Sequence, residues 1–198
     1  KPLSDPESSK GIGQKERDRQ HDHLLAKRGP FNDLRAPRDF LAGAVTAAVT
    51  QPLLCDGERH PVGLTDREQG TAAASACGKA LVSGTVREAR MAGWLEFIER
   101  NPTAWLYCWR GGLRSSTVQD WLRAEGVAIE RVPGGFKALR QRCLELIDRA
   151  PGAKPWLILG GRTGTVNTVV LKEVPGSIDL EGLANHRVSA FGAASSPQ

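Results

Sequence analysis

The chain has 198 residues, 40% of them hydrophobic, so it is long enough for one packed domain and part of a second. No apolar stretch approaches the roughly 20 residues that span a membrane, and the charged N-terminus is unlike a secretory signal, which favours a cytoplasmic protein without membrane contact. A formal net charge of +5 suits a polyanionic partner, whereas four scattered cysteines without a CxxC pair argue against a metal site or a disulfide framework.

The N-terminal residues are polar and charged, and they precede the first strong apolar segment. Residues 1–14 lack apolar periodicity and are expected to be disordered, while residues 15–29 are expected to form a short helix. Residues 1–29 therefore form an extension, and a first domain is predicted to occupy residues 30–150.

The first part of that domain alternates short apolar runs with breaks. Residues 31–34 and 44–49 predict strands, with a helical turn over 38–43 between them. Residues 51–70 are polar and carry Pro52, Gly57, Pro61 and Gly63, so we expect a long functional loop or a lid.

Two helices are predicted next. Alanines at helical spacing indicate a helix over 71–82, and a second one over 86–100 ends before Pro102. The predicted buried face of the second helix comprises Met91, Trp94, Leu95 and Ile98.

A short apolar run then ends in Cys108, and a tight turn with two glycines and two arginines leads into a helix over 115–125. In a strand–loop–helix arrangement, loop N–H groups and the positive end of the helix dipole converge on the sulfur. Such a place stabilises a thiolate and an anionic group beside it, whereas a merely structural cysteine needs neither the glycines nor the arginines. We interpret Cys108 as a nucleophile exposed at the floor of an electropositive bowl. The predicted substrate-binding residues are Arg110, Gly111, Gly112, Leu113 and Arg114.

The remaining segments continue the alternation. A strand over 128–132 and a Pro-Gly-Gly turn precede a helix over 136–150, whose predicted inward side chains are Leu139, Cys143, Leu146 and Ile147. Pro151-Gly152 is expected to mark a domain boundary, and residues 156–159 a further strand before a glycine-rich loop. Alternating strands and helices predict an α/β fold, a parallel sheet with helices on both faces and ligand sites at the carboxyl ends of its strands.

These segments together resemble the rhodanese domain of bacterial tRNA 2-selenouridine synthases. YCWRGGLRS and DLEGLANHR are the most specific motifs. The resemblance rests on DLRAPRDF (33–40), VGLTDREQG (62–70), LVSG (81–84), YCWRGGLRS (107–115), GGFKALR (134–140), DLEGLANHR (179–187) and SAFG (189–192).

The resemblance implies a tRNA-modifying transferase. Members of this family replace the sulfur of 2-thiouridine at the wobble position with selenium from selenophosphate, and can pass through an S-geranylated intermediate made from geranyl diphosphate. By this resemblance Cys108 is the essential rhodanese-type cysteine. The candidates for contact with tRNA are Arg110, Arg114, Lys137, Arg140, Arg142, His186 and Arg187.

The family also implies a P-loop domain after the rhodanese domain, and residues 151–198 are expected to be a truncated P-loop-like fragment. Its phosphate-loop remnant comprises Gly161, Gly164 and Thr168. Val166 occupies the position of the last glycine and Asn167 that of the lysine, which predicts weak phosphate binding, because a Cβ obstructs close backbone approach and the positive charge is missing.

Two alternatives to the transferase remain open. Cys108 and Arg114 also fit the C-x5-R spacing of cysteine-dependent phosphatases, some of which have a rhodanese-like fold, although Tyr107 replaces their usual histidine. The altered phosphate loop also suits a catalytically degenerate binding module.

Overall fold

The computed structural model describes residues 6–27, 29–160 and 167–183 of the chain. The chain divides into two compact units, Lys1–Leu146 and Ile147–Gln198. The first unit contains the sheet and the predicted nucleophile, and the two units are considered separately below.

The first unit is built on a four-stranded parallel sheet with the order β2-β1-β3-β4. Its strands are short: β1 (Phe31–Asp33), β2 (Ala48–Thr50), β3 (Trp105–Tyr107) and β4 (Glu130–Arg131). The register aligns Phe31 with Trp105 and Asp33 with Tyr107. The segments that follow β1 and β3 therefore emerge at the same edge of the sheet, and the Leu34 N–H donates to the Tyr107 carbonyl at 2.9 Å.

Side-chain alternation along the central strands divides the core in two. Leu106 belongs to a cluster built with α5 and α6, whereas Tyr107 belongs to a second cluster that contains Leu24 of α1 and Leu139 of α7. Because successive residues of a strand point to opposite faces, helices cover both faces of the sheet. The predicted α/β class, with a parallel sheet between helices, is confirmed.

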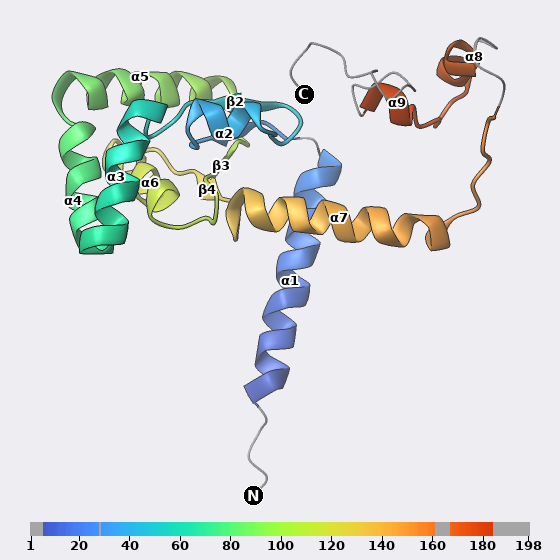
Figure 1. The fold of residues 1–198 in the computed structure, drawn as a ribbon, viewed down its shortest axis with the longest axis horizontal. Helices are drawn as coiled ribbons and strands as arrows, with labels where there is room; N and C mark the ends of the chain where they lie inside the picture. The colour runs from blue at the N-terminus through green and yellow to red at the C-terminus, as the bar shows by residue number, and fades with distance from the viewer. Residues whose placement is uncertain (1–5, 28, 161–166, 184–198) are drawn as a thin grey trace, which may run out of the picture. The chain divides into compact units, whose positions relative to one another are not determined.

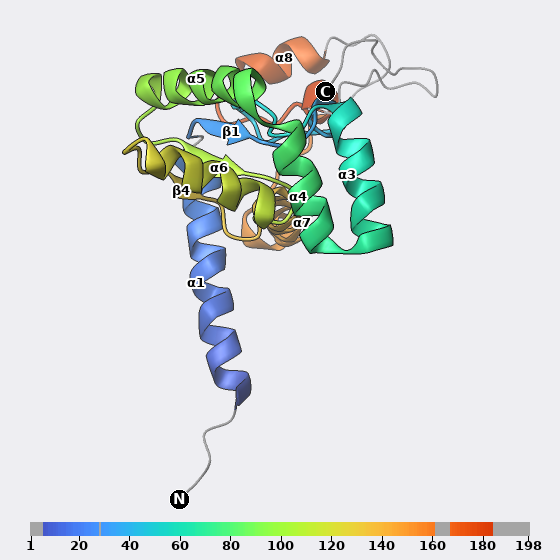
Figure 2. The same ribbon diagram turned by 90° about the vertical axis from the view of Figure 1, so that its left-hand side faces the viewer.

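The helices follow the sequence pattern in most places, and Figures 1 and 2 both show α3 and α4 side by side as a hairpin. Among the described residues, no helix has the length and apolar character needed to cross a bilayer. The helices are α1 (Pro6–Lys27), α2 (Pro37–Leu41), α3 (Asp56–Gln69), α4 (Thr71–Leu81), α5 (Gly84–Arg100), α6 (Leu113–Ala124), α7 (Gly135–Ala153), α8 (Asn167–Glu173) and α9 (Leu180–Leu183).

Two predictions for the first unit are wrong. Residues 6–14, expected to be disordered, belong to the helix α1, which continues to Lys27. The C-terminal part of this helix packs on the core through Leu24. The polar segment expected to be a loop contains α3. A capping box starts this helix: the Cys55 N–H donates to Glu58 Oε2 at 2.7 Å, and the Cys55 side chain accepts from the backbone. Since no residue of α3 is buried, hydrophobic periodicity could not indicate it.

Three predictions near residue 150 are also wrong. The helix α7 does not end at the Pro151-Gly152 step but runs on to Ala153. Leu146 and Ile147, which were expected to face inward, are 38% and 65% exposed. Residues 156–159 form no strand, because in the described part of the second unit no other strand pairs with them.

Candidate active site

Cys108 immediately follows β3, at the edge of the sheet where the segment after β1 also emerges. Its side chain is only 3% exposed, so the expected exposed thiol is a buried one. Successive side chains along the strand point to opposite faces of the sheet. Tyr107 therefore lies in one core cluster and Cys108 in the other, among apolar neighbours. The Cys108 thiol donates to Ser115 Oγ at 3.4 Å, and the Ser115 hydroxyl donates to the Gly112 carbonyl at 3.0 Å.

Although nearly covered, Cys108 lines a pocket of about 420 Å³. Of the loop residues predicted to bind substrate, Arg110, Gly112, Leu113 and Arg114 line the same pocket. Gly111 does not: it lies against the turn before α7, where a Cβ on it would be 3.0 Å from the Val132 carbonyl oxygen. The structure therefore brings the thiol and most of the predicted loop residues to one cavity.

The opposite wall of this pocket comes from the α3–α4 hairpin, which sequence reasoning did not connect with the site. Its apolar part includes Val62 and Ala74, and Leu54 and Trp121 extend this surface from neighbouring segments. The charged residues that the hairpin contributes to the pocket are Arg59, Asp66 and Lys79. The pocket thus combines a largely apolar wall with a group of cationic side chains around the Cys108 loop.

The backbone of the Cys108 loop presents free donors. In the described part of the chain, none of the N–H groups from Trp109 to Arg114 donates a hydrogen bond to a protein acceptor. They include the first N–H groups of α6, whose dipole adds positive potential at the same end. Gly111 has φ +66°, a left-handed conformation that favours glycine in this tight turn. Apart from the N–H of Gly111, whose nitrogen lies against Gly135, these donors belong to residues that line the pocket, and they suit an anionic group.

The first residues of α7 are in backbone contact with this loop. The N–H groups of Phe136 and Lys137 donate to the carbonyls of Cys108 and Trp109, at 2.9 and 3.0 Å. Gly135 has φ +63°, and a Cβ on it would collide with the Cys108 carbonyl oxygen. Two glycine-containing turns far apart in the sequence are therefore in direct backbone contact.

A buried ion pair lies behind the same loop. Arg35 donates to both carboxylate oxygens of Asp33, with the shortest distance 2.6 Å, and both side chains are almost fully buried. The Arg35 guanidinium carbon lies 3.8 Å from the centre of the Phe136 ring, which in turn packs against Trp109 at 5.7 Å. Burial disfavours the charge on Arg35, but hydrogen bonding and the charge of Asp33 outweigh it and raise the Arg35 pKa.

The ion pair and Ser115 were not among the predicted site residues. The DLRAP motif contains Asp33 and Arg35, but nothing in its spacing indicates that Arg35 stacks on Phe136, which packs against Trp109 of the loop. Ser115 follows Arg114 at the start of a predicted helix, and this position could have identified it as a site residue. A small hydroxyl residue in the first turn after the cysteine loop is within reach of the thiol.

The predicted tRNA-contacting residues fall into different environments. Lys137 and Arg140 are exposed on α7. Arg142 is not available: it is 9% exposed and donates to both carboxylate oxygens of Asp22 at 2.7 Å, which raises its pKa. His186 and Arg187 lie outside the described residues.

Of the predicted phosphate-loop remnant, Thr168 lies in α8, whereas Gly161 and Gly164 lie outside the described residues.

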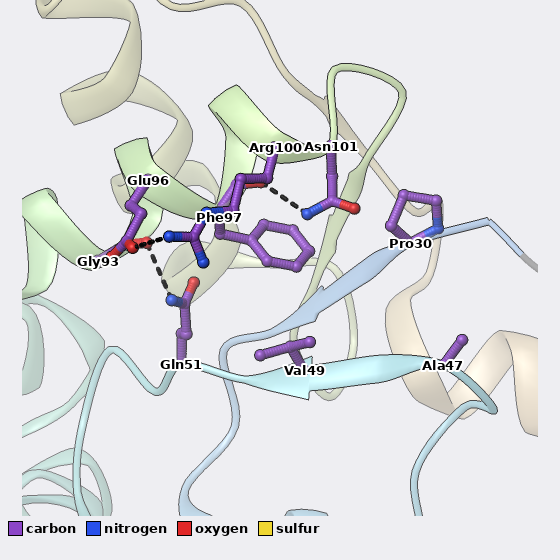
Figure 3. A pocket seen from close by; sticks show the side chains of 9 residues that line it. All are labelled: Pro30, Ala47, Val49, Gln51, Gly93, Glu96, Phe97, Arg100 and Asn101. Atoms are coloured by element: carbon purple, nitrogen blue, oxygen red, sulfur yellow. Dashed lines mark hydrogen bonds and ion pairs between the residues drawn. The ribbon is translucent and has the colours of Figure 1, made fainter.

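A second hollow, of about 520 Å³, lies between the edge strand β2 and α5 (Figure 3). Its polar side chains are engaged with one another or with the backbone. The Gln51 side chain donates to the Gly93 carbonyl at 2.9 Å, and Arg100 pairs with Glu96 at 2.6 Å. Since Cys108 and its loop do not line this hollow, it is not a candidate for the thiol chemistry.

Comparison with known proteins relates both parts of the chain to one family. A family model described as the tRNA 2-selenouridine synthase AAA domain matches residues 154–198. The tRNA 2-selenouridine synthase of Cupriavidus necator is 51% identical over 160 residues, which cover 81% of this chain and 44% of that protein. The same-named protein of Sulfurovum sp. is 48% identical over 175 residues, which cover 88% of this chain and 48% of that protein.

A third relative agrees with these two. The tRNA 2-selenouridine synthase of Shewanella sp. strain MR-7 is 47% identical over 178 residues, which cover 90% of this chain and 48% of that protein. The chain is therefore a homologue of the tRNA 2-selenouridine synthases, and it spans a little less than half the length of these relatives.

A solved structure shares the fold of part of the chain. It is the crystal structure of the N-terminal domain of a "putative ATP/GTP binding protein" from Clostridium difficile 630. The two are 27% identical with a TM-score of 0.55, and the match covers 59% of this chain and 90% of that one.

Proposed function

We propose that this chain provides the thiol-bearing part of a tRNA 2-selenouridine synthase, a transferase in which Cys108 takes up or delivers the chalcogen exchanged at a 2-thiouridine of tRNA. One observation carries this proposal: Cys108 lines a pocket together with a loop whose N–H groups have no acceptor in the described part of the protein. The homology to tRNA 2-selenouridine synthases supplies the substrate class.

The loop suits an anionic chalcogen donor such as selenophosphate. Its free N–H groups, the start of α6 and the cations Arg110 and Arg114 all favour a negative group next to the sulfur. They also favour the thiolate, which is the nucleophilic form of Cys108. The Ser115 hydroxyl, 3.4 Å from the sulfur, is a further donor for that thiolate once it turns away from Gly112.

The apolar wall of the pocket supports the finer proposal that a geranyl chain from geranyl diphosphate is accommodated there. Val62, Ala74 and Trp121 offer the chain an apolar surface, while the diphosphate would meet the cations of the loop. For tRNA, the accessible candidates are Lys137 and Arg140 on α7, together with Arg110 and Arg114 at the pocket. His186 and Arg187 remain candidates by resemblance.

Sulfur transfer from thiosulfate tests the role of Cys108 directly. The thiolate attacks the outer sulfur of thiosulfate, the S–S bond of the donor breaks, sulfite leaves, and a persulfide remains on the protein. Trypsin releases residues 101–110, a peptide whose single cysteine is Cys108, so mass spectrometry detects the added sulfur. We expect the persulfide in the wild-type chain and in a Cys77→Ser control but not in Cys108→Ser. Release of sulfite from thiosulfate by Cys108→Ser at the wild-type rate would contradict the proposal.

A phosphatase is the second candidate, and the C-x5-R loop with its free N–H groups is the observation that favours it. Hydrolysis of an aryl phosphate, measured beside sulfur transfer, separates the two reactions. We expect sulfur transfer without appreciable hydrolysis. Hydrolysis without sulfur transfer would favour the phosphatase. The absence of both activities would favour a binding module.

A further inference from the structure

We infer that His21, on the N-terminal helix α1, is a positioning residue for the Cys108 loop. His21 is only 2% exposed, and its Nε2 lies 2.8 Å from the carbonyl oxygen of Pro133. A carbonyl oxygen only accepts hydrogen bonds, so Nε2 carries the proton and donates it. A buried imidazole is thereby fixed to one backbone group of the turn before α7.

That backbone group belongs to a peptide unit that also faces the Cys108 loop. The Pro133 carbonyl and the Gly134 nitrogen share one planar peptide bond, so a constraint on the oxygen also orients the nitrogen. A Cβ built on Gly111 would lie 3.1 Å from the Gly134 nitrogen and 3.1 Å from the Gly135 nitrogen. His21 therefore holds one side of a peptide unit whose other side abuts the loop.

The next residues complete the link from the histidine to the thiol. Gly134 and Gly135 both have positive φ, +73° and +63°, a conformation that favours glycine and lets this turn approach the Cys108 loop closely. Gly135 packs against the Cys108 carbonyl, and the Phe136 N–H donates to that carbonyl at 2.9 Å. A shift of the Pro133 peptide is thus transmitted to the residue that bears the thiol.

The helix α1 does not depend on His21 for its attachment. Asp22 accepts two 2.7 Å hydrogen bonds from Arg142, and Leu24 is 4% exposed in the cluster that contains Tyr107, Val132 and Leu139. Removal of the His21 hydrogen bond should leave the helix docked, so positioning can be separated from packing. The inference rests on the proposed function of Cys108.

Two substitutions of His21 in the full chain test the inference. His21→Phe keeps a ring but removes the donor, and His21→Gln keeps an N–H donor. The readouts are kcat/KM for sulfur transfer from thiosulfate and the rate of carboxymethylation of Cys108. A net hydrogen bond of about 1 kcal/mol corresponds to roughly a fivefold change in rate. We therefore expect both rates to fall about fivefold in His21→Phe and to recover in His21→Gln. His21→Leu replaces His21→Phe if the latter does not fold.

Leu24→Ala is the matched control, since it weakens the packing of α1 without touching the hydrogen bond. We expect it to lower Tm more than His21→Phe does while it changes both rates by less than about twofold. Unchanged rates in His21→Phe, or an equal loss in Leu24→Ala, would overturn the inference while the proposed function stands. A wild-type chain whose Cys108 neither transfers sulfur nor reacts would overturn both.

Discussion

At the residue scale, the buried sulfur of Cys108 and the Ser115 hydroxyl form a pair whose hydrogen bonds depend on charge. In the neutral form the thiol donates to Ser115, which donates to Gly112. The thiolate cannot donate, so its stabilisation requires the serine hydroxyl to turn toward the sulfur. The free N–H groups of the loop then act beside it.

Ser115→Ala should slow every reaction of the Cys108 thiolate. A hydrogen bond to a charged group contributes about 1.5–3 kcal/mol, so the rate of alkylation of Cys108 near neutral pH should fall roughly tenfold or more. Ser115→Thr should restore most of the rate, because it keeps the hydroxyl. Ser116→Ala removes a neighbouring hydroxyl that bonds to the Leu113 carbonyl and should have no effect. A Ser115→Ala rate equal to the wild-type rate would exclude the serine as a thiolate donor.

Tyr107 is the single tyrosine of the chain, and its environment predicts the response of the fold to alkaline pH. Burial and the nearby charge of Asp33 raise the pKa of Tyr107 above its usual range. In the unfolded chain the phenol ionises near pH ~10, so its contribution to stability is present below that pH and is lost as the pH rises further. Phenolate absorbance should therefore appear together with unfolding, and Tyr107→Phe should unfold at higher pH. Phenolate formation in the folded chain near pH ~10 would contradict this.

At the element scale, the first residue of α7 leaves no room for a Cβ. Gly135→Ala meets both a positive φ and the Cys108 carbonyl oxygen, so it should lower the free energy of unfolding by roughly 2–4 kcal/mol. Gly152→Ala, on the same helix with open space around it, should be neutral or slightly stabilising. Urea denaturation measures both variants. A Gly135→Ala chain as stable as wild type would show that the two turns do not constrain each other.

The elements also show how far the sequence predicts the site. Glycines, arginines and a strand–loop–helix pattern were enough to locate the Cys108 loop, because they are local. The α3–α4 wall was missed, since α3 is mostly polar with no buried residue, and its capping box uses a cysteine where serine or threonine is usual. The burial of Cys108 was missed as well, because it depends on packing between segments that are distant in the sequence.

At the scale of the whole molecule, the alternation of strands and helices predicted the parallel sheet correctly. The predicted boundary at residue 151 differs from the division of the chain between residues 146 and 147. The helix α7 runs through both positions without a break. A helix can connect two units without any break in its periodicity. Neither a proline nor a glycine near its C-terminal end shows where one unit stops.

The second unit exposes apolar side chains, with Leu157 99% and Ile158 89% exposed. Contiguous exposed apolar residues bind hydrophobic probes and promote association. The double substitution Leu157→Ser and Ile158→Ser should therefore reduce anilinonaphthalene sulfonate fluorescence and concentration-dependent association, with unchanged reactivity of Cys108. Undiminished anilinonaphthalene sulfonate fluorescence in the double variant would show that the probe binds to a surface other than Leu157 and Ile158.

The most direct test of the account is the reaction of Cys108 in the folded chain with iodoacetate and iodoacetamide, followed in the tryptic peptide of residues 101–110. If the thiol lies at the floor of an anion-binding pocket, the ratio of the iodoacetate rate to the iodoacetamide rate should be higher in the folded chain than in urea. Arg114→Gln should lower this ratio, and Arg123→Gln, at the far end of α6, should not. Modification of Cys108 only after unfolding, while the exposed Cys55 reacts in the folded chain, would contradict the account.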